Sequence, residues 1–176
     1  MDEYFDLIER YVAANPVMED GTPNIPFTIL CDGWRYFCLE NIPQFLDGYP
    51  NDGSCIVDPD TLQVYDYNTT DTAKWYFKKL NEEYHKDILG AEVFTETYED
   101  YLAKLSTGAV CGMPDQWWQF YYSIQKAYDE QGLRGLRLCS TSDYQRGRNR
   151  QSMACNALCR AGQLYRIIHY GILRGY

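Results

Sequence analysis

Two short stretches hold the residues best suited to chemistry, and both combine tryptophan with a charged side chain. Trp34 and Arg35 stand together in the first stretch, and Asp115, Trp117 and Trp118 stand together in the second. An indole ring packs against the apolar face of a sugar, while a guanidinium donates hydrogen bonds to hydroxyls. These residue types predict a wall that binds a small polar ligand. The alternative for the first stretch is a half-buried tryptophan beside a structural ion pair.

The adjacent tryptophans have a second geometric property. If Trp117 and Trp118 lie on one helix, their side chains point about 100 degrees apart. One ring can then pack in the core while the other faces the ligand. The sequence leaves open which of the two faces the ligand.

Both stretches are expected to follow buried strands. Residues Ile25–Leu30 form a plausible strand before Trp34, and Ala109–Met113 form a short apolar run that Pro114 is expected to end, because proline lacks a ladder donor. A helix over Gln116–Glu130 follows the second run. Loops that leave the carboxyl ends of strands are where open α/β sheets place ligands, so the predicted fold class is α/β.

Helical periodicity and turn signals divide the rest of the body of the chain. Thr69 or Thr70 is expected to cap a helix, and Gly108 stands where a left-handed cap ends another. The expected elements are helices over Asp2–Ala14, Tyr36–Phe45, Thr70–His85 and a short helix that carries Tyr98 to Leu105, with a hairpin of Ser54–Val57 and Gln63–Tyr67.

The sequence predicts no metal site and no cofactor. Asp58, Asp60 and Asp66 lack the spacing of a calcium loop, so turn-forming and capping roles are expected for them. The cysteines form no paired CxxC motif. Cys155 and Cys159 could be half of a metal knuckle, but the chain offers no second half.

Three cysteines of the body leave the redox state open. Cys31, Cys38 and Cys55 could supply a disulfide if the protein is exported. Buried free thiols are the favoured interpretation.

The order of motifs resembles a known family. A lysine-bearing helix, then Ser-Thr-Gly, a strand of small residues and a loop with tryptophan follow one another, and the chain also carries Asp-Gly-Trp-Arg-Tyr-Phe, Gly-Tyr-Pro-Asn-Asp-Gly and Val-Asp-Pro-Asp-Thr. This collinear set is similar to the extracellular solute-binding proteins of ABC importers, closest to their large lipoprotein branch. The resemblance extends from Tyr4 to about Gln131.

The resemblance implies a fold, a ligand and a partner. Such proteins have two lobes, so the chain is expected to be part of one lobe of a periplasmic-binding-protein-like fold. The strand after Gly108 would cross between the lobes, and the tryptophan loop would line the cleft. The resemblance implies a sugar ligand, an ABC permease as partner of the intact parent, and no catalytic chemistry. The parent is expected to be extracellular and membrane-anchored.

Two segments that an exported or membrane-spanning chain would carry are not recognisable. No charged and apolar leader is visible, and no run of about 18 apolar residues. The given chain is therefore expected to have no membrane span and to stay cytoplasmic if expressed as it stands.

The charge of the chain changes abruptly near residue 131. Residues 1 to 130 carry 24 acidic and 8 basic side chains, a net of −16, whereas residues 131 to 176 carry 1 acidic and 8 basic side chains, a net of +7. The acidic body argues against a nucleic-acid partner, since phosphate contacts need clustered basic residues. The expected division is residues 1–132 as the solute-binding fragment and 133–176 as an unrelated, disordered tail.

A shift of reading frame explains the tail better than a domain does. Residues 131 to 176 contain no Lys, Glu, Val, Pro, Phe or Trp. Read one base further on, Leu138 to Met153 can give Tyr-Val-Pro-Leu-Pro-Ile-Ile-Lys-Glu-Gly-Val-Ile-Asp-Lys-Val-Trp, in which the step from Met153 to Ala154 forces tryptophan. This peptide resembles the segment after the cleft helix in the family. The shift is expected between about Gln131 and Arg137.

Three alternatives stay open. The tail could bind nucleic acid through Arg146, Arg148 and Arg150, although its aromatic interleaving is poor. The body could belong to a carbohydrate-active hydrolase with a carboxylate pair such as Asp115 and Asp32. A stand-alone interaction domain would unfold cooperatively by itself.

Overall fold

The computed structural model describes residues 2–47, 55–58, 60–115, 117–131, 136–141 and 154–160. The larger elements are α1 (Asp2–Ala14), β1 (Ile25–Phe27), α2 (Phe37–Glu40), α3 (Ile42–Leu46), β2 (Cys55–Val57), β3 (Val64–Asp66), α4 (Asp71–His85), α5 (Tyr98–Ser106), β4 (Val110–Asp115), α6 (Trp117–Gln131), β5 (Leu136–Thr141) and β6 (Ala154–Arg160). The fold is α/β, as predicted.

The main sheet has four strands in the order β1-β4-β6-β5. Strands β1 and β4 are parallel, with Ile25 opposite Val110 and Phe27 opposite Gly112. Strand β6 runs antiparallel to both β4 and β5. The parallel pair brings the carboxyl ends of β1 and β4 to the same edge of the sheet, so the two stretches with tryptophan start near each other.

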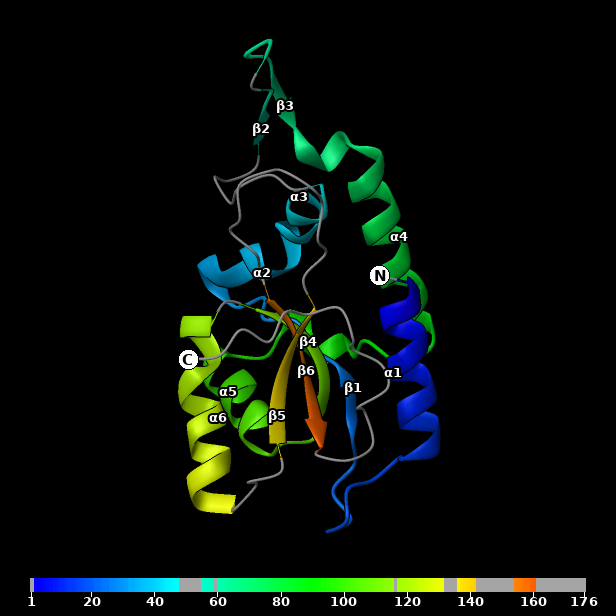
Figure 1. Cartoon of the computed structure of the whole chain (residues 1–176), viewed down its shortest axis with the longest axis vertical. Helices are drawn as coiled ribbons and strands as arrows, with labels where there is room; N and C mark the ends of the chain where they lie inside the picture. The colour runs from blue at the N-terminus through cyan, green and yellow to red at the C-terminus, as the bar shows by residue number, and fades with distance from the viewer. Residues whose placement is uncertain are drawn as a thin grey trace.

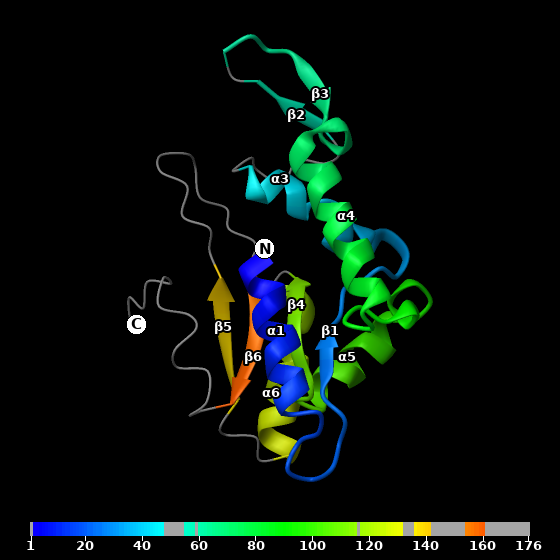
Figure 2. The same cartoon turned by 90° about the vertical axis from the view of Figure 1, so that its right-hand side faces the viewer.

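Helices cover the sheet on both sides. Figure 1 shows α1 on one side of the sheet and α5 with α6 on the other, and the turned view in Figure 2 agrees. Helices α2, α3 and α4 lie toward one end of the molecule, and the β2–β3 hairpin projects beyond them. The carboxyl ends of β1 and β4 point toward that end of the molecule (Figure 2).

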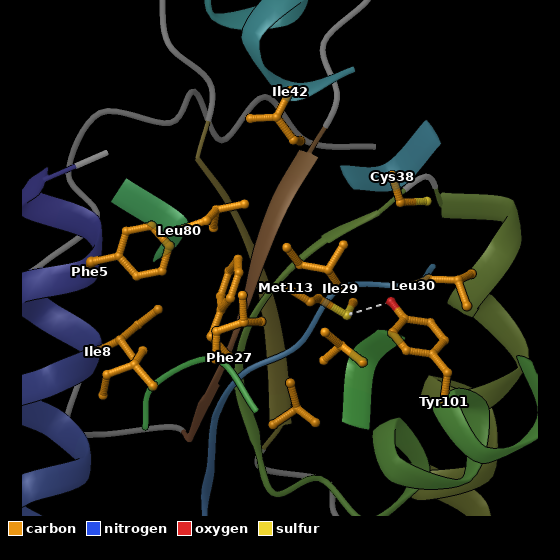
Figure 3. Close-up of a cluster of buried hydrophobic side chains, with 14 of the residues drawn as sticks. Phe5, Ile8, Phe27, Ile29, Leu30, Cys38, Ile42, Leu80, Tyr101 and Met113 are labelled. Carbon is orange, nitrogen blue, oxygen red and sulfur yellow. Dashed lines mark hydrogen bonds between the residues drawn. The ribbon is translucent and has the colours of Figure 1, made fainter. Parts of the chain in front are cut away.

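The core fills the space between α1, the sheet and α5. Phe5 of α1 meets Phe27 of β1 edge to face, with ring centroids 4.9 Å apart. Figure 3 shows these aromatic rings on one side of the sheet and Tyr101 of α5 on the other. An added Cβ at Gly112 would come within 2.6 Å of Ile8 Cδ1, so a larger residue there would require the side-chain ends of α1 to shift.

The helix predictions hold where local signals decide the structure. Helix α1 has the predicted bounds. Thr70 caps α4 by accepting a hydrogen bond from the Ala73 amide at 3.1 Å. Gly108 has a φ of 73°, which confirms the predicted left-handed cap after α5.

The prediction of one helix over Tyr36–Phe45 is wrong. The structure has a 3-10 helix, Gly33–Tyr36, followed by α2 and α3, which are divided at Asn41. Pro43 explains the division, because proline lacks the amide hydrogen that a continuous helix needs but fits the first turn of a new one.

The predictions of the two parallel strands both need correction. Strand β1 ends at Phe27 rather than Leu30. Strand β4 continues through Pro114 to Asp115, opposite Cys155 and Ala154 of β6. A proline costs one ladder donor, and the antiparallel neighbour keeps the chain extended beyond it.

The hairpin and its aspartates are as predicted. Strands β2 and β3 pair antiparallel. Asp58 Oδ1 accepts hydrogen bonds from the Asp60 and Thr61 amides at 3.0 and 2.8 Å, and Asp66 Oδ1 accepts one from the Asn68 amide at 2.9 Å. These aspartates form turns and caps, which confirms the expected role.

Two strands lie within the predicted tail, residues 133–176. At β5 and β6 the structure differs from the expected disorder, because an antiparallel ladder uses backbone groups and does not require a selected apolar pattern. The rest of that range lies outside the described residues, including Arg146, Arg148 and Arg150. The frameshift stays a prediction.

Candidate functional site

Trp34 and Arg35 lie in the 3-10 helix that follows β1, at the edge where β4 also ends. Trp34 is 63% exposed, which is high for so large an apolar side chain. Its ring stacks on Phe37 of α2 with centroids 5.7 Å apart. The indole is thus held against Phe37 while much of the side chain meets solvent.

Arg35 lies against two aromatic rings. Its guanidinium carbon is 3.9 Å from the centroid of the Tyr98 ring and 4.7 Å from that of the Trp34 ring. Arg35 Nε donates a hydrogen bond to Gln119 Oε1 at 3.2 Å. These contacts fix the guanidinium in position, because cation–π attraction and a directed hydrogen bond restrict a side chain that is otherwise mobile.

Tyr98 and Gln119 are site residues that the sequence did not single out. Tyr98 opens α5 and Gln119 lies in α6, so they are 63 or more residues from Arg35 along the chain. The Tyr98 hydroxyl donates to the Gln119 carbonyl oxygen at 2.7 Å, which joins the two helices beside Arg35. Tyr98 was expected only as one residue of a helix face, and no local pattern points to Gln119.

Asp115 is not part of the surface. Its side chain is fully buried, and its oxygens accept hydrogen bonds from the Tyr101 hydroxyl at 2.8 Å and the Cys38 thiol at 3.3 Å. The prediction that Asp115 lines the ligand wall therefore differs from its place in the structure. The strand continues one residue beyond Pro114, and that residue turns into the layer between the sheet and α5.

Burial and the buried carboxylate both make the neighbouring hydroxyl and thiol less acidic. Burial, then the charge of Asp115, raises the pKa of the Tyr101 hydroxyl well above its ordinary range. The same two causes raise the pKa of the Cys38 thiol. Both groups therefore stay protonated and act as donors to Asp115.

Gln119 connects this buried group to the surface. Its amide nitrogen donates to Cys38 Sγ at 3.7 Å, while its oxygen accepts from Arg35. A chain of contacts runs from Asp115 through Cys38 and Gln119 to the guanidinium. Asp115 is thus joined to Arg35 only through Cys38 and Gln119 and does not itself reach the surface.

Asp32 also has a structural role. Its Oδ2 accepts the Tyr98 amide hydrogen at 3.0 Å, at the first turn of α5. A hydrolase would need two carboxylates that face a substrate. One member of the pair Asp115 and Asp32 is buried and the other already holds a backbone amide, so this pair gains no support from the structure.

Trp117 and Trp118 begin α6, directly after β4, as the sequence predicted. Both residues are therefore within two positions of Gln119 along α6, and the Gln119 side chain contacts Arg35. The positions of the two indole rings lie outside what the structure describes, and the question of which ring faces the ligand stays open.

A second charged cluster lies beside the end of β1. Lys104 Nζ is 2.5 Å from Glu96 Oε2 and 3.4 Å from Glu92 Oε1, and it lies 3.5 Å from the Thr28 hydroxyl. The side chains of Lys104 and Glu96 are 14% and 5% exposed. The charge of Lys104 is thus neutralised within the cluster, and the lysine joins α5 to the residue that follows β1.

Burial raises the pKa of three described thiols, those of Cys31, Cys38 and Cys111. Cys31, Cys38, Cys55 and Cys111 are free. Burial, with a smaller contribution from the charge of Glu96, raises the pKa of Cys31 to about 11, so its thiol is neutral near pH 7.

No group of three or more His, Cys, Asp or Glu side chains could hold a metal ion within the described ranges. Cys155 and Cys159 lie four residues apart on β6, which separates their Cα atoms by roughly 13 Å, too far for one ion. No helix within the same ranges is long and apolar enough to cross a membrane.

Comparison of the chain with protein-family models, with curated proteins and with solved structures finds no match. The site must therefore be interpreted from its own geometry.

Proposed function

We propose that this chain binds a sugar on the surface formed by Trp34 and Arg35, as part of one lobe of a solute-binding protein that serves an ABC importer. The observation that carries the proposal is the fixed guanidinium beside an exposed indole, at the carboxyl ends of two parallel strands. The two groups supply what a sugar needs, an apolar face and hydrogen-bond donors.

The surface is suited to binding rather than to chemistry. A guanidinium only donates hydrogen bonds, so Arg35 can hold the hydroxyls or the carboxylate of a ligand. The carboxylates nearest to it in the network, Asp115 and Asp32, are engaged with Tyr101, Cys38 and the Tyr98 amide. The arrangement therefore favours capture of an unchanged ligand.

In the proposed whole protein, a second lobe would close over this surface and trap the sugar. Capture by closure shifts the population between open and closed forms, and a permease would recognise the closed form. The intact parent would be extracellular and membrane-anchored. One wall without its closing partner should bind weakly, with Kd roughly 1 mM.

The test is a titration of residues 1–176 with a panel of neutral and acidic oligosaccharides, followed by ligand-observed NMR. Trp34→Ala should weaken binding of any sugar that binds by about tenfold or more, because stacking area is lost. Trp75→Ala is the matched control, since Trp75 is also partly exposed but lies on α4.

Two results contradict the proposal. In the first, no sugar of the panel binds at 10 mM, which is about ten times the expected Kd. In the second, Trp34→Ala and Trp75→Ala weaken binding equally, which would place the sugar elsewhere.

A further inference from the structure

Arg35 differs from the other described basic residues of the body in its partners. Six of them lie within 4.0 Å of a carboxylate oxygen: Arg10 with Asp6, Lys74 with Asp71, Lys78 with Glu82, Lys79 with Glu83, Lys86 with Glu9 and Lys104 with Glu96. Among the described residues, Arg35 has no carboxylate within that distance. This is unexpected for a body with three acidic side chains for each basic one.

The guanidinium of Arg35 also has N–H donors without an acceptor among the described residues. Its Nε is used by Gln119, whereas no described residue accepts a hydrogen bond from its two terminal nitrogens. Those two nitrogens form the edge that binds a carboxylate with two parallel hydrogen bonds. A half-buried cation without a counter-ion has lost part of its hydration. An anionic ligand therefore interacts more favourably with it than a neutral ligand does.

We propose that the ligand carries a carboxylate on a sugar ring, which makes it a uronic acid or a short oligosaccharide that contains one. This inference rests on the proposed function and names the ligand class of the same surface. The carboxylate would meet the two terminal nitrogens of Arg35, and the ring that bears it would stack on Trp34, whose indole lies on the same guanidinium.

The charge of the body restricts the inference to short ligands. Residues 1 to 130 have a net charge of −16, which repels a long polyanion. At physiological salt this repulsion is screened beyond about 8 Å, whereas a carboxylate in contact with Arg35 is not screened. One ionised group at the site is therefore favoured over many.

The experiment compares each acid with its own methyl ester, which differs only by the loss of charge. Residues 1–176 are titrated at pH 7 with trimers of galacturonic acid and of guluronic acid, each as the free acid and as the fully esterified trimer. At least one acid should bind about ten- to a hundredfold more tightly than its ester, which is the effect of one bidentate charged pair.

Two variants locate the preference. Arg35→Gln should remove the difference between acid and ester, while Arg10→Gln, which removes the same charge from an exposed ion pair on α1, should leave the difference unchanged. Arg35→Lys should keep only part of it, because an ammonium lacks the paired donors.

The outcomes separate the two proposals. If acid and ester bind equally and Trp34→Ala weakens both, the sugar surface stands and the uronate inference is overturned. If neither acid binds more tightly than its ester, or if Arg10→Gln abolishes the preference as fully as Arg35→Gln does, the inference is likewise overturned.

Discussion

Arg35 and Lys104 are two cations near the same end of β1, and they differ in the groups that contact them. Lys104 lies between Glu96 and Glu92, almost without exposure, and its charge is neutralised within the protein. Arg35 lies against two aromatic rings, with a neutral amide on Nε and no carboxylate among the described residues. We interpret this contrast as the difference between a cation that stabilises the fold, Lys104, and a cation that is proposed to meet a ligand, Arg35.

The comparison predicts its largest effect at Lys104. Lys104→Met should lower the free energy of unfolding by about 3 kcal/mol, because it leaves Glu96 buried without a cation. Chemical denaturation measures this change. In the double variant Lys104→Met, Glu96→Gln, a good part of the loss should be recovered, and no recovery would show that the pair is not the source.

A smaller loss is expected behind Arg35. Tyr101→Phe removes the hydroxyl that donates to Asp115 and should cost about 1–3 kcal/mol of unfolding free energy, since a buried carboxylate loses a donor. Sugar affinity should stay within about twofold, because Asp115 does not reach the surface. A tenfold loss of affinity in a folded variant would show instead that Asp115 positions Arg35 through Cys38 and Gln119.

The smallest effect concerns the first turn of α5, which carries Tyr98. Hydrogen bonds from the Thr97 hydroxyl and amide hold the pKa of Asp100 below its ordinary value. A depressed pKa contributes stability above the unfolded value, and this contribution is lost as the pH falls below about 4. Stability should therefore decline less steeply from pH 5 to pH 3 in Asp100→Asn than in the parent.

The control for this acid effect is a substitution on another helix. Asp71→Asn removes the same charge from the first turn of α4. If both variants flatten the pH profile equally, general charge rather than the Thr97 capping box explains the effect.

Local elements of the fold could be predicted from the sequence because their causes are local. Helix α4 has its cap at Thr70 and an apolar face at helical spacing, and Gly108 ends α5 through its own backbone freedom. Strand β4 was predicted too short, because its pairing with β6 depends on residues about 40 positions away. A lone proline could not show that the strand continues past it.

The site was predicted in part for the same reason. Trp34 and Arg35 could be chosen from their chemistry and from the strand before them. Their partners Tyr98 and Gln119 come from α5 and α6, and no residue spacing in the sequence predicts such long-range contacts. Asp115 was misplaced because its burial depends on Tyr101 and Cys38, which approach from two other helices.

The most direct test measures two quantities for two matched variants, Arg35→Met and Lys104→Met. The two variants should show opposite patterns. Arg35→Met should lose acidic-sugar binding by tenfold or more while losing about 1 kcal/mol of stability, the worth of its ring contacts. Lys104→Met should lose about 3 kcal/mol of stability and keep its affinity while folded. If Arg35→Met destabilises the fold as much as Lys104→Met does and leaves binding unchanged, Arg35 is a structural cation and the central claim is wrong.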